Sequence, residues 1–584
     1  MKNTILIILF GISILYGQKE SENNWLTKFE KSNFLETSKY DETIKYFQRL
    51  ADYSDFAELK TIGLSPQGRE LKCLIVSKNK FFTPTAAKQH NNKVTILINN
   101  GIHSGEIEGK DASMLLLREI LVTKTKESLL DNVILLVIPV FNLDGHERFS
   151  KYNRINQNGP KEMGWRVTAQ NFNLNRDFAK ADTPEMKSLL KLYSKWLPDI
   201  FIDTHTTDGA DYQYTITYGI TSHQEVPPQT RSLVNKELIP FFEHKVKQAG
   251  YLLMPYVGFI NGDYKNGIRD WVSTPRFSHC YAGAQNRIGI LMETHMLKPY
   301  KDRVFATKAM LESIIEYSNK NYKKIIDCST NADRYTIQKY STEHKPYPLK
   351  IDITNKSKKF LYKGIKYKLV YSNITGSKIR KFTDEKYSIE VPYFNETKIV
   401  DSVYLPKAYI IPQEWKALVD ILLLHGIKFN KPEEKKKYIV EKYKFKNVHF
   451  PPNSYESHFI PQYDFEKIID TVEVNKGDYY IPTKQRSLGM IAYLLEPKSI
   501  ESFVKWGLMN IIFERKEYFE DYSMEPIAER MYKKNKFLRK EFNNLVKNDS
   551  AFASNPKRRL NYFYERSPYY DKKYNVYPIL RVIK

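Results

Sequence analysis

Cysteine is scarce in this sequence, with three residues among 584. The three thiols, Cys73, Cys280 and Cys328, can form one disulfide at most, and none has the spacing of a structural metal site. A small scaffold held together by several disulfides is therefore excluded, and a hydrophobic core must hold the fold. The length favours two to four domains rather than one.

Long apolar runs are absent after the first residues. Residues 4–16 (TILIILFGISILY) are uncharged and apolar, with Lys2 before them and a polar run after Gly17 and Gln18. Thirteen apolar residues are too few to span a bilayer comfortably. This three-part pattern is typical of a secretory signal peptide. We therefore expect residues 1–18 to be removed, a secreted or periplasmic location, and no membrane span.

Motifs of several common function classes are also missing. The sequence contains no His-Glu-x-x-His, no Gly-x-Ser-x-Gly, no phosphate-binding loop and no dinucleotide-binding fingerprint. Basic residues outnumber acidic ones by 91 to 67, which gives a formal net charge of +24. No nucleic-acid-binding module accompanies this charge, so we predict no nucleic acid as a partner. Contact with an anionic polymer of the cell envelope stays open.

The first half of the chain alternates between strand and helix patterns. Continuous apolar runs predict buried strands, and amphipathic runs predict helices. Strands are expected at residues 93–101, 132–140, 199–205 and 287–295, and helices at residues 111–121, 184–196 and 302–320. This order predicts an α/β fold with a mixed sheet sandwiched by helices, in a first domain at residues 25–328.

The sequence pattern changes after about residue 330. Residues 347–373 alternate with period two, which predicts a β-rich domain at residues 335–412. Residues 413–584 form a mixed region that becomes helical from residue 487 onward. No internal repeat and no low-complexity linker marks the boundaries.

Metal-ligating side chains lie at the ends of the predicted strands. His103 and Glu106 follow one strand in NNGIHSGEIEG, His205 ends another in FIDTH, and Glu293 lies near the end of a third in LMETH. Active-site residues gather beyond the carboxyl ends of the strands in α/β sheets. Two imidazoles and one carboxylate leave a fourth position open, as in catalytic zinc sites. We predict Zn²⁺ held by His103, Glu106 and His205; Glu108 is a competing ligand with less suitable spacing.

Six segments resemble motifs of one enzyme family. NNGIHSGEIEG, PVFNLDG, GWRVTAQNFNLNRDF, TPEMK, FIDTHTTDG and LMETH occur in the order found in the carboxypeptidase A-like zinc peptidases. The resemblance covers roughly residues 40–325, a little over half of the chain. The long C-terminal extension resembles that of an exported bacterial subgroup of this family.

The resemblance implies a role for each matching residue. Glu293 would be the general base that activates the attacking water and then passes the proton to the leaving amine. Arg166 would stabilise the oxyanion. Asn175 and Arg176 would hold the terminal carboxylate of the substrate, a task that suits the planar fork of an arginine. The implied function is zinc-dependent release of C-terminal residues from a peptide substrate.

Two positions depart from the family pattern. The family usually has an Asp that orients a zinc-bound His, and this sequence has Asn173 there, with Asp203 as a possible substitute. The flexible Tyr that covers the substrate has no clear match, because the pattern puts Ser273 near its position. Tyr281 is our substrate-binding candidate, and ordinary packing is an equally good interpretation of it. His295, two residues after Glu293, is a further candidate near the site.

Two other functions remain open from the sequence alone. The same zinc chemistry is compatible with hydrolysis of peptidoglycan stem peptides or of N-acyl amino acids. A catalytically silent polymer-binding protein is the alternative from another class. The presence of His103, Glu106, His205 and Glu293 together argues against a silent protein, because a decayed site usually loses one of them first.

Overall fold

The structure is a computed structural model that describes residues 22–583 except residue 91. The predicted signal peptide at residues 1–18 lies outside the described residues. Among the residues that are described, no helix is long and apolar enough to cross a membrane. Cys73, Cys280 and Cys328 are all buried free thiols.

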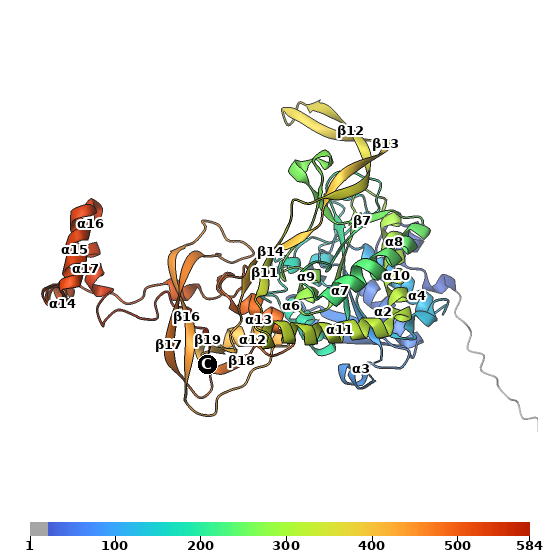
Figure 1. The fold of residues 1–584 in the computed structure, drawn as a ribbon. Helices are drawn as coiled ribbons and strands as arrows, with labels where there is room; N and C mark the ends of the chain where they lie inside the picture. Colours follow the sequence, from blue (N-terminus) through green and yellow to red (C-terminus); the bar gives the residue numbers. More distant parts are fainter. Residues whose placement is uncertain (1–21, 91, 584) are drawn as a thin grey trace, which may run out of the picture.

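An eight-stranded mixed sheet forms the centre of the first half (Figure 1). Its strands, in spatial order, are β1 (Ala57–Leu64), β2 (Glu70–Val76), β4 (Val133–Ile138), β3 (Val94–Asn99), β5 (Ile200–Thr207), β10 (Ile288–His295), β6 (Ile216–Ile220) and β7 (Leu253–Pro255). β4, β3, β5 and β10 run parallel to one another, and β1 and β2 pair antiparallel with their neighbours. β6 pairs antiparallel with β10 and parallel with β7. The continuously apolar strands β3, β4 and β10 are buried along their whole length, as expected for strands covered on both faces.

Helices cover this sheet. They are α2 (Tyr40–Tyr53), α4 (Glu108–Leu121), α6 (Pro184–Trp196), α8 (Ile239–Gln248), α9 (Ser278–Ala284), α10 (Tyr300–Lys320) and α11 (Tyr322–Thr336), with the shorter α1 (Lys28–Lys31), α3 (Pro84–His90), α5 (Leu143–Glu147) and α7 (Pro228–Leu233). α10 packs against α4 and α8, while α6 and α9 contact strands of the sheet. The start of α6 follows from its sequence, because Thr183 caps the helix and Pro184 occupies its first position. The predicted α/β class is confirmed.

The β-rich region is hydrogen-bonded into the first half. β11 (Tyr347–Ile353) and β14 (Thr397–Val403) pair with each other. β12 (Lys358–Ser372) and β13 (Ser377–Phe394) form a long hairpin, and β13 continues the sheet onto β9 (Ile268–Asp270) and β8 (Val257–Phe259). One sheet therefore crosses the boundary predicted near residue 330, and the predicted domain limits stay predictions.

The last region contains a five-stranded sheet and a separate helical bundle. The sheet has the order β17 (Gln462–Val474), β16 (Lys436–His449), β19 (Leu580–Val582), β15 (Ala408–Ile411) and β18 (Tyr479–Pro482), with α12 (Lys416–Leu424) and α13 (Leu488–Leu495) beside it. The bundle consists of α14 (Asp521–Lys534), α15 (Lys536–Asn548), α16 (Ser550–Ala553) and α17 (Pro556–Tyr564), and it stands apart from the rest in Figure 1. A single apolar cluster runs from Trp25 to Ile579, so the C-terminal sheet shares its core with the first half.

Candidate metal centre and active site

His103, Glu106 and His205 converge on one point. His103 and Glu106 lie in the loop between β3 and α4, and His205 lies near the end of β5, which pairs with β3. One ligand atom from each of the three side chains lies within 4.8 Å of the others. Glu106 faces both imidazoles, with 3.2 Å from Oε1 to His103 Nδ1 and 3.0 Å from Oε2 to His205 Nδ1. The structure therefore brings together the three ligands that the sequence predicts.

The other ring nitrogen of each imidazole contacts a different partner. His103 Nε2 donates to Asn173 Oδ1 at 3.0 Å, and His205 Nε2 donates to Asp203 Oδ2 at 2.6 Å. An amide or carboxylate oxygen can only accept, so each Nε2 carries a proton, and Nδ1 is the nitrogen of each ring that would bind a metal in its deprotonated form. Asp203 therefore does not replace Asn173 beside His103, because it orients the other imidazole.

These side chains fit a divalent cation. His103 Nδ1 is buried and makes no hydrogen bond with any described residue. Two imidazole lone pairs and a carboxylate around one point repel one another unless a positive charge lies between them. Two nitrogen donors and one carboxylate also form the ligand set of open catalytic zinc sites.

Burial and charge act differently on the two imidazoles. Burial lowers the pKa of His103 to about 4, which leaves the ring neutral and able to bind a metal. Burial also lowers the pKa of His205, but the carboxylates of Asp203 and Glu106 outweigh it and hold that pKa well above its ordinary value. The surroundings of His205 thus favour a positive charge at this point.

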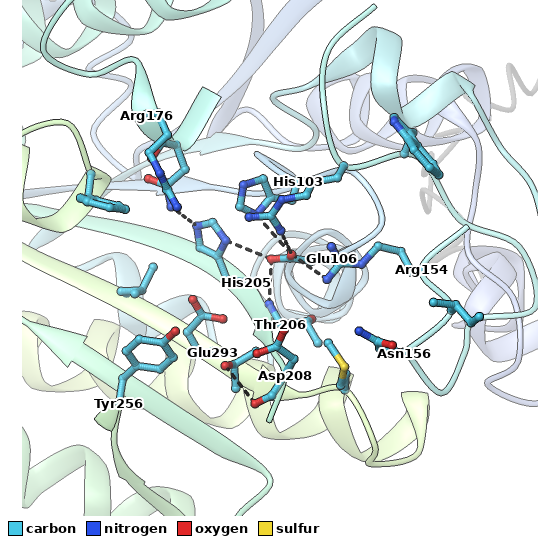
Figure 2. A pocket seen from close by; sticks show the side chains of 18 of the residues that line it. His103, Glu106, Arg154, Asn156, Arg176, His205, Thr206, Asp208, Tyr256 and Glu293 are labelled. Atoms are coloured by element: carbon cyan, nitrogen blue, oxygen red, sulfur yellow. Dashed lines mark hydrogen bonds and ion pairs between the residues drawn. The ribbon is translucent and has the colours of Figure 1, made fainter. Parts of the chain in front are cut away.

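A cavity of about 580 Å³ opens beside the three ligands. Figure 2 shows His103, Glu106 and His205 pointing toward one another, with Glu293 at the same cavity. Glu293 lies on β10 directly opposite His205 in the parallel register. Burial, together with the nearby carboxylates of Glu106 and Asp203, raises the pKa of Glu293 to about 8.

Two arginines contact Glu106 from the cavity side. Arg166 Nη1 lies 3.2 Å from Glu106 Oε1, and Arg154 Nη2 lies 2.7 Å from the same atom. Arg166 is a predicted site residue, whereas sequence reasoning missed Arg154. Its side chain crosses over Gly105, where an added Cβ would lie 2.5 Å from Arg154 Cγ. Gly105 was the only feature of the sequence that could have indicated the close approach of Arg154 to Glu106.

Asn175 and Arg176 also line the cavity. Asn175 Oδ1 accepts from the backbone N–H of Ser278 at 3.2 Å, which fixes the amide. The Arg176 guanidinium donates to the Asn175 carbonyl at 2.7 Å and lies 4.3 Å from the centre of the Phe277 ring. An arginine held in this way can present its remaining N–H groups to an anion in the cavity.

Tyr281 does not reach the cavity. It lies on α9, is fully buried, and its hydroxyl accepts a hydrogen bond from Gln285 Nε2 at 2.9 Å. Its ring packs against Phe178 and Tyr193 in the core. The position of Tyr281 therefore does not support substrate binding, and the packing interpretation holds.

Tyr256 lines the cavity instead. It directly precedes β8, while Trp271 directly follows β9 and lines the same cavity. Both side chains belong to the short hairpin at residues 256–271, and the sequence analysis singled out neither of them.

The remaining candidates have structural contacts. His295 donates to the Ala210 carbonyl at 3.1 Å and packs on the Tyr212 ring. Glu108 pairs with Arg303 at 2.9 Å and accepts from the Thr206 hydroxyl. Neither lines the cavity, so the structure favours Glu106 over Glu108 as the ligand.

The C-terminal region contacts the segment that carries Asn173, Asn175 and Arg176. A tight turn between Tyr455 and His458 places Glu456 Oε2 3.3 Å from the Asn173 backbone nitrogen, which donates to it. His458 Nε2 donates to Asp182 Oδ2 at 2.7 Å. No sequence motif indicated these contacts, which join residues more than 270 positions apart.

Comparisons with known proteins show which family part of the chain resembles. Residues 43–307 match the profile of the zinc carboxypeptidase family. Carboxypeptidase 2 of Trichophyton rubrum is 21% identical to this chain over 488 residues, which cover 81% of this chain and 84% of that protein. Carboxypeptidase 2 of Trichophyton tonsurans is 21% identical over 490 residues, which also cover 81% of this chain and 84% of that protein.

Solved structures that are similar to this chain include carboxypeptidase A of Helicoverpa armigera and a metallo-carboxypeptidase of Burkholderia cenocepacia. The first has a TM-score of 0.35 and 16% identity, covering 51% of this chain and 74% of that one. The second has a TM-score of 0.35 and 15% identity, covering 48% of this chain and 70% of that one. From the family match, residues 43–307 are a zinc carboxypeptidase domain, and the chain is a hydrolase of the zinc metallocarboxypeptidase type.

Proposed function

We propose that this chain releases C-terminal residues from peptides at a single zinc ion held by His103, Glu106 and His205. The observation that carries the proposal is the convergence of these three side chains on one point, with His103 Nδ1 buried and without a hydrogen bond to any residue that the structure describes. The same cavity is lined by another carboxylate, Glu293, which is not among the three ligands.

The bound zinc would supply a Lewis acid that polarises the scissile carbonyl and makes water a stronger nucleophile at neutral pH. Glu293 would accept the proton of the attacking water and donate it to the departing amine. Its position opposite His205 supports this role. Arg166 would donate hydrogen bonds to the oxyanion as its negative charge develops.

Asn175 and Arg176 would bind the terminal carboxylate of the substrate. Their support is the anchored Asn175 amide and an Arg176 guanidinium that lines the cavity. Tyr256 and Trp271 would cover the bound end of the peptide, because they line the same cavity and would exclude water from the reacting bond.

We also infer that the chain is exported to a secreted or periplasmic location. The support is the basic, apolar and polar order of residues 1–18. Peptides outside the cytoplasm would then be the available substrates.

Metal analysis and turnover test the proposal together. The purified chain is expected to hold one zinc per molecule and to release the last residue of N-blocked dipeptides, and a chelator should abolish the release. Hydrolysis of muropeptides alone would replace the proposal with a stem-peptide hydrolase. Zinc binding without turnover of either substrate would favour the silent binding protein.

A further inference from the structure

The hairpin of β12 and β13 projects from the body of the protein (Figure 1). Its outer part pairs from Tyr367 opposite Phe382 to Ser372 opposite Ser377. The strands are joined by a short turn at residues 373–376, where Gly376 has a φ of 61° that suits glycine. This outer part, residues 367–383, is here called the hairpin tip.

Large apolar side chains are exposed on the hairpin tip. Those with more than a third of their surface exposed are Leu369, Val370, Tyr371, Ile374 and Ile379. Ile374, in the turn itself, is 96% exposed. A gathering of apolar side chains at the end of a projecting element is unusual for a free surface and indicates a contact with another apolar phase.

The hairpin tip is also uniformly basic. Residues 367–383 contain Lys368, Lys378, Arg380 and Lys381 and no Asp or Glu. Within the part of the chain that the structure describes, none of the three lysines forms an ion pair.

Closer to the body, acidic residues accompany the basic ones. Lys366 pairs with Glu385 at 2.7 Å, and Lys359 pairs with Glu390 at 2.9 Å. The stretch of the hairpin that has basic residues and no acidic residue is thus its outer end, which also exposes the apolar side chains.

We propose that the hairpin tip docks on an anionic lipid bilayer. Ile374 and its apolar neighbours would enter the boundary between headgroups and acyl chains, and Tyr371 would lie at the interface, where tyrosine is enriched. The lysines would contact anionic headgroups while their stems lie along the apolar layer. A second copy of the chain fits this surface less well, because tip-to-tip contact would bring four cations from each copy together.

The hairpin that carries the tip is joined through its base to a wall of the catalytic cavity. β13 pairs through Tyr393 and Phe394 with β9, and β9 pairs with β8. The ends of β8 and β9 carry Tyr256 and Trp271, which line the cavity. One sheet therefore connects the hairpin tip with a wall of the active site. The lipid contact does not depend on the proposed reaction.

Vesicle co-sedimentation tests the proposal. The chain and its variants are mixed with vesicles of phosphatidylcholine and with vesicles of phosphatidylcholine and phosphatidylglycerol. Mass spectrometry confirms that all samples share one N-terminus, so that residues 4–16, where present, contribute equally. We expect binding to the anionic vesicles that weakens as salt is added.

Two variants test the electrostatic part and the apolar part of the lipid contact separately. Lys378→Glu with Lys381→Glu should weaken binding by at least about 25-fold, because each basic residue near an anionic surface contributes about fivefold. Ile374→Asp should weaken it roughly tenfold through loss of apolar burial.

Matched control variants make the same kinds of substitution at exposed positions outside the hairpin tip. Lys187→Glu with Lys191→Glu reverses two exposed charges on α6, and Leu64→Asp replaces an exposed leucine on β1. Both should bind vesicles as the unmodified chain does. Equal loss in tip and control variants would overturn the proposal, as would absence of binding to anionic vesicles. A dimer in solution that Ile374→Asp abolishes would assign the tip to a second copy and would also overturn it.

Discussion

The two halves of this chain contribute to the active site in different ways. The first half supplies every residue of the predicted metal set, from the ends of adjacent buried strands. The C-terminal region supplies none of them, yet Glu456 and His458 contact the segment that holds Asn173 and Asp182. The comparison shows that the C-terminal sheet and its loops pack against the catalytic domain, whereas the bundle of α14 to α17 stands apart from it.

Glu293→Gln should reduce turnover by roughly 10²–10⁴-fold, because it removes the proposed proton acceptor. Zinc content should stay unchanged, since Glu293 lies outside the three-ligand set. Steady-state kinetics with a blocked dipeptide and metal analysis of the same sample measure both. Glu414→Gln, an exposed glutamate of the C-terminal region, is the matched control. Turnover within a few-fold of the unmodified chain would remove Glu293 from the mechanism.

Glu185→Gln should stabilise the first half at neutral and alkaline pH. Glu185 is fully buried, neither carboxylate oxygen has a hydrogen-bond partner among the described residues, and burial raises its pKa to about 7. The folded state therefore keeps this proton after the unfolded chain has lost it near pH 4.5, and stability falls as the pH rises from there to about 7.

The expected gain from Glu185→Gln is about 3 kcal/mol in the free energy of unfolding above pH 7 and close to zero below pH 4. Denaturant unfolding of both proteins across this pH range measures it. If the free energy of unfolding of the variant and that of the unmodified chain differed by the same amount at every pH, the pKa of Glu185 would be the same in the folded and unfolded states.

Asp203→Asn should weaken zinc binding by about 10–100-fold, since a carboxylate that accepts from a ligand imidazole raises its basicity. Asn173→Ala, beside the other imidazole, should weaken it less, because the neutral amide contributes less to basicity. Competition with a chromophoric chelator measures both affinities. A larger loss of zinc affinity in Asn173→Ala than in Asp203→Asn would contradict the view that the charged partner of His205 matters more than the neutral partner of His103.

His458→Ala should have the smallest effect, because it removes one hydrogen bond from the C-terminal region to Asp182. The segment with Asn175 and Arg176 would then be held less firmly, which should raise KM about twofold to tenfold with little change in kcat. His449→Ala, an exposed histidine on the same hairpin, is the control. Equal KM values for the two variants would show that the extension does not position the site.

The convergence of His103, Glu106 and His205 could be predicted because the buried strands that position them are visible in the sequence. His103 and Glu106 share one loop, and His205 and Glu293 are placed by strands whose burial is visible in their apolar sequences. The fold class follows from the same alternation of strands and helices, and the predicted helix at residues 184–196 is confirmed at both ends.

The rest of the cavity depends on contacts that no local pattern encodes. Arg154 reaches Glu106 across a loop, and Tyr256 is placed by a hairpin that pairs with β13. The sequence leaves Tyr281 open between substrate binding and ordinary packing, because the direction in which α9 faces cannot be read from seven residues. Packing against Phe178 and Tyr193 turns that side chain into the core.

Zinc-edge X-ray absorption on the purified chain tests the central claim most directly. The account predicts one zinc per chain with two imidazole nitrogens at about 2.0–2.1 Å and further oxygen ligands, and loss of one imidazole in His205→Ala. A spectrum with sulfur ligands, or one that His205→Ala leaves unchanged, would contradict it.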